Sequence, residues 1–202
     1  KTFDLPANWK LVTEAFLEGY HAPRLHAKSV GGQFTDTSTI YSMFGPHSRQ
    51  LSGRKVFEPS ILESDVNIHR YVTSSHVIFP NMSIITSPYY TSYMIFMPRG
   101  VDRTWVEYYM MTDGPADSEK AADLFQRSFD LILKVFGEED FKASSSAHAA
   151  LATGAIPEIY FGGLEPLCGP FHDGVDDLLA EAARWTAERL RRLQRRSRAA
   201  LP

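Results

Sequence analysis

The middle of the chain is a series of short segments rich in β-branched and aromatic residues, and this series limits the possible folds most strongly. Pairs such as Gly45-Pro46, Pro80-Asn81 and Ser87-Pro88 separate the segments and are typical of turns. Segments of this composition between turn residues predict an antiparallel sheet. The predicted strands cover residues 38–44, 48–57, 67–73, 76–79, 82–87, 90–97 and 103–112.

Helical patterns flank this predicted sheet on both sides. Residues 9–21 predict a helix that ends before Pro23, because proline cannot donate to the helical ladder. After the sheet, Asp117 or Ser118 is suited to cap a helix that runs to Phe136 and ends at Gly137. A second helix is predicted over residues 138–151, and a long one from about Asp173 to Arg198. A helix, a sheet and further helices favour a single α+β domain over residues 1–202.

Composition excludes several classes of protein. With 202 residues, 44% apolar and 22% charged, the chain has the size and composition of one ordinary globular domain. A net charge of −3 gives no field that would attract nucleic acid or an anionic membrane, and no apolar run is long enough to span a bilayer. Cys168 is the only cysteine, so the chain holds no cysteine-ligated cluster and we expect a cytoplasmic location.

Two histidines, His21 and His26, are candidate metal ligands. Five helical steps would place them about 140° apart, so they can reach one ion only if the helix breaks between them. Pro23 supplies such a break, and leaves one histidine on the last helical turn and the other on the following loop. Two neighbouring histidines are also common as surface or capping residues, and the spacing alone leaves both interpretations open.

Carboxylates accompany these histidines. Glu14 and Glu18 share a predicted helical face with His21, and acids beside ligating histidines commonly orient the ring. The run 137–140 places Asp140 at the start of a predicted helix, where it could complete a site of two histidines and one carboxylate. Acidic residues are also favoured in a first helical turn for electrostatic reasons alone, so the run remains open to that explanation.

Three motifs resemble signatures of the α subunits of Rieske-type aromatic-ring-hydroxylating oxygenases. Asn8-Trp9-Lys10, followed by a Glu-x-Tyr-His-x4-His pattern that ends at His26, is similar to the iron-binding motif. Glu139-Asp140 with His148 resembles the second signature, although the family often has an amide where His148 stands. The stretch from Glu165 to His172 resembles the C-terminal Glu-x6-His motif, and the resemblance extends from Lys1 to about Leu179.

The resemblance implies a catalytic domain with one mononuclear Fe(II). His21, His26 and Asp140 take the positions of the iron ligands, and Glu18 takes that of the acid that bridges to a Rieske cluster ligand. Phe16 is a candidate for the substrate pocket, although an aromatic residue at such a position is more often part of the core. The implied fold is a helix-grip of the START/Bet v1-like kind, in which a curved antiparallel sheet wraps the long C-terminal helix.

The resemblance also implies partners that this chain does not itself contain. We expect a Rieske [2Fe-2S] domain upstream, a ferredoxin or reductase as electron donor, O2, and a small apolar organic substrate. A homotrimer and a role in aromatic hydrocarbon catabolism are further expectations, and partners among nucleic acids or membranes are not expected. Without a Rieske cluster, the chain alone should not sustain multiple oxygenation turnovers.

Three other functions compete with this one. A non-enzymatic helix-grip domain would bind a hydrophobic ligand and leave His21, His26 and Asp140 idle. An Fe(II)/2-oxoglutarate oxygenase would require a His-x-Asp or His-x-Glu motif, and neither motif occurs in this sequence. The arginines of the last helix could bind nucleic acid or a membrane, but cations near a helix C-terminus are commonly only solvated. The arginines in question are Arg184, Arg189, Arg191, Arg192, Arg195, Arg196 and Arg198.

Overall fold

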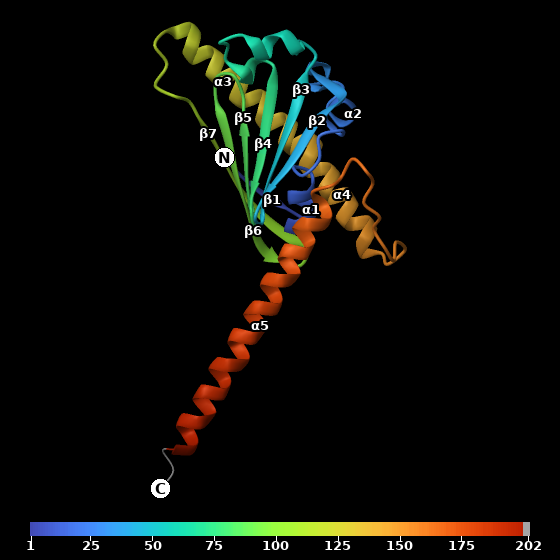
Figure 1. Cartoon of the computed structure of the whole chain (residues 1–202), viewed down its shortest axis with the longest axis vertical. Helices are drawn as coiled ribbons and strands as arrows, with labels where there is room; N and C mark the ends of the chain where they lie inside the picture. The colour runs from blue at the N-terminus through green and yellow to red at the C-terminus, as the bar shows by residue number, and fades with distance from the viewer. Residues whose placement is uncertain (200–202) are drawn as a thin grey trace.

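A seven-stranded antiparallel sheet organises the protein in this computed structural model (Figure 1). The structure describes the backbone of residues 1–199 and the side chains within that range except those of 36–38, 62 and 193–199. The strand order is β1-β7-β6-β5-β4-β3-β2. The strands are β1 (Thr2–Leu5), β2 (Phe34–Phe44), β3 (His47–Arg54), β4 (Val72–Ile78), β5 (Met82–Thr86), β6 (Thr91–Gly100) and β7 (Arg103–Met111).

The helices lie before and after the strands, which confirms the α+β class. Short helices α1 (Trp9–Glu14), α2 (Ala22–Leu25) and η1 (Gly31–Gln33) precede β2, and η2 (Pro59–Glu63) and η3 (Ile68–Arg70) precede β4. The predicted strands 67–73 and 76–79 are in fact η3 followed by the single strand β4, and β1 was not predicted. After the sheet come α3 (Glu119–Val135), η4 (Phe136–Asp140), α4 (Phe141–Ala152) and α5 (Cys168–Ala199).

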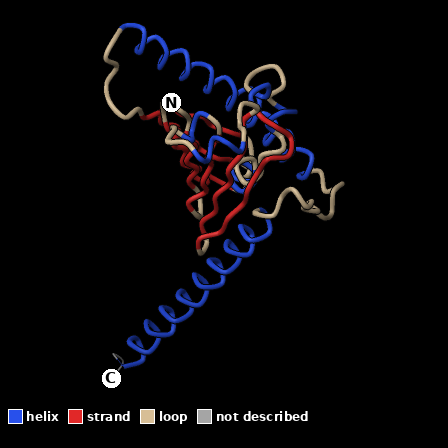
Figure 2. The backbone as a smooth tube through the Cα atoms, turned by 45° about the horizontal axis from the view of Figure 1, so that its top comes forward, coloured by secondary structure: helices blue, strands red, loops and turns tan. Residues whose placement is uncertain are grey.

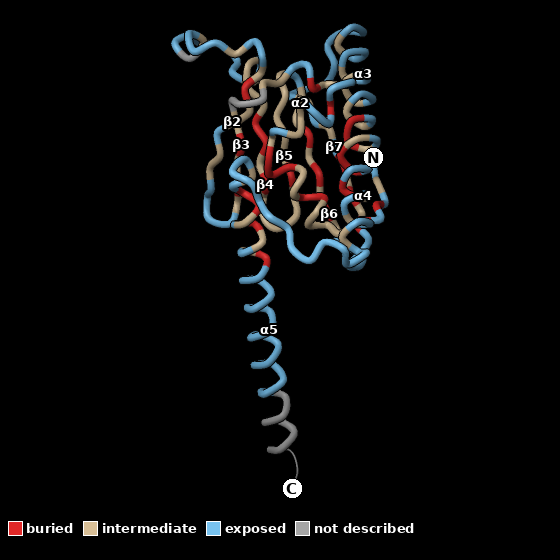
Figure 3. The backbone as a smooth tube through the Cα atoms, turned by 90° about the vertical axis from the view of Figure 1, so that its right-hand side faces the viewer, coloured by how far each residue is buried: buried red, intermediate tan, exposed pale blue. Residues whose placement is uncertain are grey.

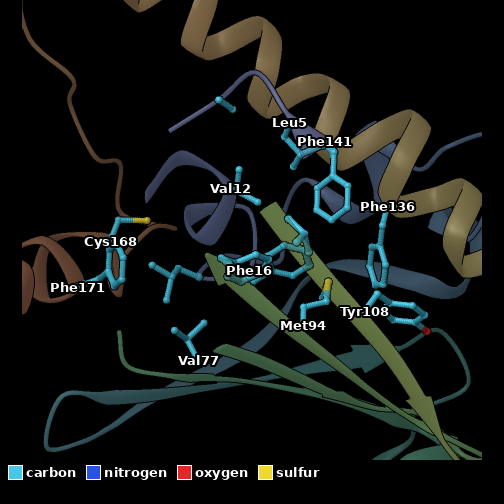
Figure 4. Close-up of a cluster of buried hydrophobic side chains, with 14 of the residues drawn as sticks. Leu5, Val12, Phe16, Val77, Met94, Tyr108, Phe136, Phe141, Cys168 and Phe171 are labelled. Atoms are coloured by element: carbon cyan, nitrogen blue, oxygen red, sulfur yellow. The ribbon is translucent and has the colours of Figure 1, made fainter. Parts of the chain in front are cut away.

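The core lies between one face of the sheet and the segments that cover it. Alternate residues of β7 are buried, as expected for a strand with one covered face. Phe129 and Phe136 contact the ring of Tyr108, so α3 and η4 pack on this inner face (Figures 2 and 4). The buried apolar residues include Leu5, Val12, Phe16, Val77, Met94, Phe96, Val106, Tyr108, Phe136, Phe141, Cys168 and Phe171.

The prediction that the sheet wraps the C-terminal helix is wrong in one respect. The helix that runs along the sheet is α3, whereas α5 extends away from the rest of the molecule (Figures 1 and 3). Among the described side chains of α5, only those of its first two turns contact the core, through Cys168, Phe171 and Val175. Beyond Val175 the apolar residues recur at helical spacing along one side of α5, but Leu178, Leu179, Trp185 and Leu190 are all exposed. The side chains of Arg195, Arg196 and Arg198 lie outside the described residues.

Gly137 does not end a helix, contrary to the prediction. Ser118 caps α3 as predicted, with its hydroxyl accepting from the backbone N–H of Ala121 at 3.2 Å. The helix then continues through the π-helical turn η4 directly into α4. Gly137 keeps a negative φ, and a Cβ there would lie 3.1 Å from the ring of Phe3, so this glycine permits close packing instead. None of the described helices is long and apolar enough to cross a membrane.

Candidate metal centre

The segment that carries the two histidines is irregular, and the predicted helix 9–21 is too long. Helix α1 ends at Glu14, turns follow, and His21 is the residue before α2. Pro23 stands in the first turn of α2, where its missing N–H costs nothing, so it begins a helix here and does not end one. Gly31 closes the loop, because any Cβ there would lie 2.7 Å from the carbonyl oxygens of Ala22 and His26.

His21, His26 and Asp140 converge, as the motifs predicted. Their candidate ligand atoms all lie within 4.8 Å of one another. Asp140 Oδ1 lies 3.5 Å from Nε2 of His21 and 3.3 Å from Nε2 of His26. Two ligand atoms that are each about 2.1 Å from an ion and at right angles to it are about 3.0 Å apart, so little adjustment would let all three bind one metal.

The surroundings of the Asp140 carboxylate suit a bound cation. Its side chain is 2% exposed, and Oδ1 has no hydrogen-bond partner among the described residues. A buried carboxylate oxygen without a partner is costly, and a cation between Asp140 and the two imidazoles would remove that cost. The residues therefore fit a metal ion of the kind that two histidines and one carboxylate bind.

A second carboxylate orients each histidine. Glu18 pairs with Nδ1 of His21, and its other oxygen accepts from the His21 backbone N–H at 3.1 Å. Glu139 Oε2 lies 2.5 Å from Nδ1 of His26 and accepts from the hydroxyl of Ser29 at 2.8 Å. Both Nδ1 atoms are therefore occupied, and both Nε2 atoms are directed at Asp140. The sequence prediction assigned no role to Glu139, although its place beside Asp140 was a signal.

Burial and charge oppose each other at His26. Burial disfavours the imidazolium, but the neighbouring carboxylates of Asp140 and Glu139 outweigh it, so the pKa of His26 is raised. The pKa of Glu139 is lowered, because its hydrogen bonds with His26 and Ser29 outweigh its partial burial. Without a metal, the proton on His26 is thus stabilised by the carboxylates around it.

A cavity of about 310 Å³ opens directly onto these residues. His21, His26 and Asp140 form one part of its wall, and α3 covers it with Leu131, Ile132 and Val135 among other residues. Phe16 lines the cavity and is also a core residue stacked on Phe96, with ring centroids 5.5 Å apart. The sheet contributes Gln50, Ser52, Arg54, Thr73, Ser75, Ile85 and Ser92, most of which the sequence did not indicate as pocket residues.

The other residues of the motifs lie outside the cluster of candidate ligands. Glu165 accepts from the hydroxyl of Tyr20 at 2.9 Å, and His172 Nε2 lies 2.7 Å from Glu14. These contacts hold the start of α5 and the preceding loop against the segment that carries the histidines. His148 lies on α4, two turns beyond Asp140, and is not one of the grouped ligands.

Comparison with known proteins decides the family. The family described as ring hydroxylating alpha subunit, catalytic domain, matches residues 1–181. The chain belongs to this family. A comparison with curated protein sequences gave no match.

Solved structures with the same fold include several oxygenases. Dicamba monooxygenase bound to 3,6-dichlorosalicylic acid matches with a TM-score of 0.62 and 12% identity, over 90% of this chain and 58% of that one. The apo form of the quaternary ammonium Rieske monooxygenase CntA matches with a TM-score of 0.61 and 16% identity, over 87% and 45%. Naphthalene 1,2-dioxygenase from Rhodococcus sp. bound to indole gives 0.51 and 18%, over 76% and 43%. The chain thus spans about half the length of these structures, and the likeness establishes the fold.

Proposed function

We propose that this chain is the catalytic domain of a Rieske non-haem iron oxygenase that hydroxylates a small organic substrate with O2. The observation that carries the proposal is the convergence of two imidazole nitrogens on the unpaired oxygen of Asp140, at the wall of a cavity. Fe(II) held by two histidines and one carboxylate keeps coordination positions open, at which O2 can be activated.

The chain's own residues would prepare the site in two ways. Glu18 and Glu139 accept the Nδ1–H of His21 and His26, which leaves the lone pair of each ring on Nε2 and fixes the ring orientation. The cavity holds the substrate beside the ligands and limits access of water, with Phe16 as part of its wall. Glu18 is also the residue that we propose for electron entry, because it contacts His21 and takes the position of the family's bridging acid, which is commonly Asp and here is Glu.

The electrons must come from elsewhere in the assembly. A Rieske centre needs two cysteines, and this chain has one, so we propose that a [2Fe-2S] Rieske domain and a ferredoxin or reductase supply them. A homotrimer would bring a donor domain close to Glu18 of a neighbouring copy. The lone buried Cys168 suits the reducing cytoplasm, which is the location we propose.

Iron stoichiometry after anaerobic Fe(II) loading tests the proposal. We expect about one iron per chain in the unchanged protein and none in His21→Ala or Asp140→Ala, because each removes a ligand of a three-ligand site. His148→Ala is the matched control and should retain iron, since His148 lies outside the cluster. Absence of iron, or binding that ignores both substitutions, would instead favour a non-enzymatic domain that binds a hydrophobic ligand.

A further inference from the structure

Arg54 places a positive charge in the wall of the same cavity. It is the last residue of β3, and its Nε donates to the hydroxyl of Thr73 at 3.2 Å. Nη1 donates to Oε1 of Gln33 at 3.2 Å, and the ring of Phe34 lies 6.0 Å from the guanidinium carbon. Among the side chains that the structure describes, no carboxylate lies within ion-pair distance of this guanidinium. Its partners are neutral, so its charge is not compensated.

An uncompensated guanidinium in a partly buried place is costly. Burial lowers the pKa of Arg54, yet an arginine stays protonated at any physiological pH, so the charge remains. Two of its five N–H groups are used by Thr73 and Gln33, which leaves donors for a further acceptor. A planar fork of N–H groups is the geometry that binds a carboxylate or another oxyanion through two parallel hydrogen bonds.

Two more polar groups in the cavity wall also lack partners. Gln50 and Ser75 are each 6% exposed and face each other across β3 and β4. Gln50 Nε2 donates to the carbonyls of Phe16 and Glu18, but its Oε1 has no donor, and neither has the hydroxyl of Ser75 a partner. Buried polar atoms are rarely left in this state, so water or a polar group of a ligand in the cavity would stabilise them.

These groups form a row that leads away from the candidate metal ligands. Gln50, Ser52 and Arg54 are alternate residues of one strand and therefore share a face, and Gln50 and Arg54 are about 13 Å apart along it. Gln50 holds the backbone next to Glu18, and so stands at the metal end of the row. The cavity thus has candidate iron ligands at one end, polar atoms between, and a positive charge at the other end.

We propose that the substrate is a small organic anion whose carboxylate or sulfonate group binds Arg54. The carbon that reacts lies at the candidate metal ligands, and a hydroxyl or amide group between the two ends bonds with Ser75 and Gln50. A cavity of about 310 Å³ suits a molecule of one ring or a short chain. The reaction assigned to this anion rests on the proposed function, but its binding by Arg54 does not.

Matched pairs of acids and amides test the binding directly. Isothermal titration calorimetry on the metal-free chain compares benzoate with benzamide, 2-naphthoate with 2-naphthamide, and octanoate with octanamide. We expect the acid of at least one pair to bind about 10-fold or more tightly than its amide, since a charge-assisted hydrogen-bond pair is stronger than a neutral one. Equal affinities within all three pairs overturn the proposal, and this result needs no variant.

Substitutions then identify the source of the preference. Arg54→Gln should remove the preference for the acid and leave the affinity for the amide unchanged, while Arg54→Lys should keep part of it. Arg49→Gln is the matched control, because Arg49 also lacks a described carboxylate partner but lies on the opposite face of β3 and packs on Phe44. An acid preference that survives Arg54→Gln overturns the proposal. Circular dichroism melting of each variant verifies that it is folded.

The same titrations separate this proposal from the oxygenase proposal. Metal-free protein removes direct coordination of the acid to iron, so an acid preference that depends on Arg54 stands even if no iron binds. In that case the chain binds organic anions without being an oxygenase. Iron binding at His21, His26 and Asp140 without any acid preference would instead keep the oxygenase and discard the anion.

Discussion

The two ends of the sheet's inner face bury opposite kinds of residue. At one end the face is apolar and packs against the N-terminal segment and the helices, through Val77, Met94, Phe96, Val106 and Tyr108 (Figure 4). At the other end the same alternation of strand positions presents polar side chains to the cavity, which are Gln50, Ser52, Arg54, Thr73, Ser75 and Ser92. One sheet therefore holds the molecule together at one end and borders a cavity with polar side chains at the other.

The difference shows how stability and binding are divided in this fold. The apolar end does not have to accommodate a ligand, so its side chains can pack at the density of a protein interior. The polar end leaves Gln50 Oε1 and Ser75 Oγ unpaired and borders an open cavity. The candidate metal centre lies where the two ends meet, with Phe16 in contact with both. We therefore expect substitutions at the two ends to affect different measurements.

The largest effect on stability is expected at the apolar end. Phe96 is fully buried and stacks on Phe16, so Phe96→Ala should lower the free energy of unfolding by about 3–5 kcal/mol, as measured by urea unfolding. Ile85→Ala is the comparison at the polar end, and its cost should be clearly smaller because Ile85 already borders the cavity. Equal losses would mean that the two ends are packed alike and that the division is wrong.

The next effect concerns the centre between the two ends. Glu139→Gln removes the charge that orients His26, and we expect the affinity for Fe(II) to fall about 10–100-fold. Competition with a chelator under anaerobic conditions measures this affinity. Glu138→Gln is the matched control. Glu138 is exposed and adjacent to Glu139, so its substitution removes the same charge without changing a contact with His26. Similar losses in both variants would show that only the overall charge matters.

A smaller effect is the pH dependence of the metal-free protein. The pKa of His26 is raised above its ordinary value of 6.5, so the protonated form stabilises the folded state. This contribution is fully present below the unfolded pKa and is lost as pH rises through the raised folded pKa. The urea concentration at the midpoint of unfolding should therefore decrease as pH rises above about 6.5. His26→Gln should flatten that part of the profile, and His148→Gln should leave it as it is.

The sequence predicted which residues form this centre better than it predicted how the backbone brings them together. His21, His26 and Asp140 came from motif spacing, and they do converge. The reason given for their convergence was wrong, because Pro23 starts α2 and the bend lies earlier, after Glu14. Local propensity could not show this, since the path of residues 15–21 depends on contacts with distant strands, such as that of Gln50 with the carbonyls of Phe16 and Glu18.

The cavity was the part that the sequence described least well. Two apolar strand residues illustrate this, because Ile85 lines the cavity while Phe96 lies in the core. Arg54 lies in a strand with polar residues on both faces, so alternation could not tell which face is covered. The position of α3 in place of α5 along the sheet also depends on packing that no single helix reveals. A charge inside a cavity is therefore visible only when the covering helix is known.

The smallest expected effect tests whether the polar end of the sheet's inner face is hydrated and the apolar end is not. Ser75 and Ser83 both bury a hydroxyl without a partner on the inner face, but Ser75 lines the cavity and Ser83 does not. Ser83→Ala should stabilise the protein by up to about 1 kcal/mol, because it removes an unpaired polar group from a dry site. Ser75→Ala should change the free energy of unfolding by less than about 0.5 kcal/mol, since water in the cavity can already hydrate this hydroxyl. Urea unfolding of the two variants side by side measures the difference. If Ser75→Ala stabilises the protein as much as Ser83→Ala does, the polar end is dry, and its unpaired groups need an explanation other than a solvated cavity that exchanges water for a ligand.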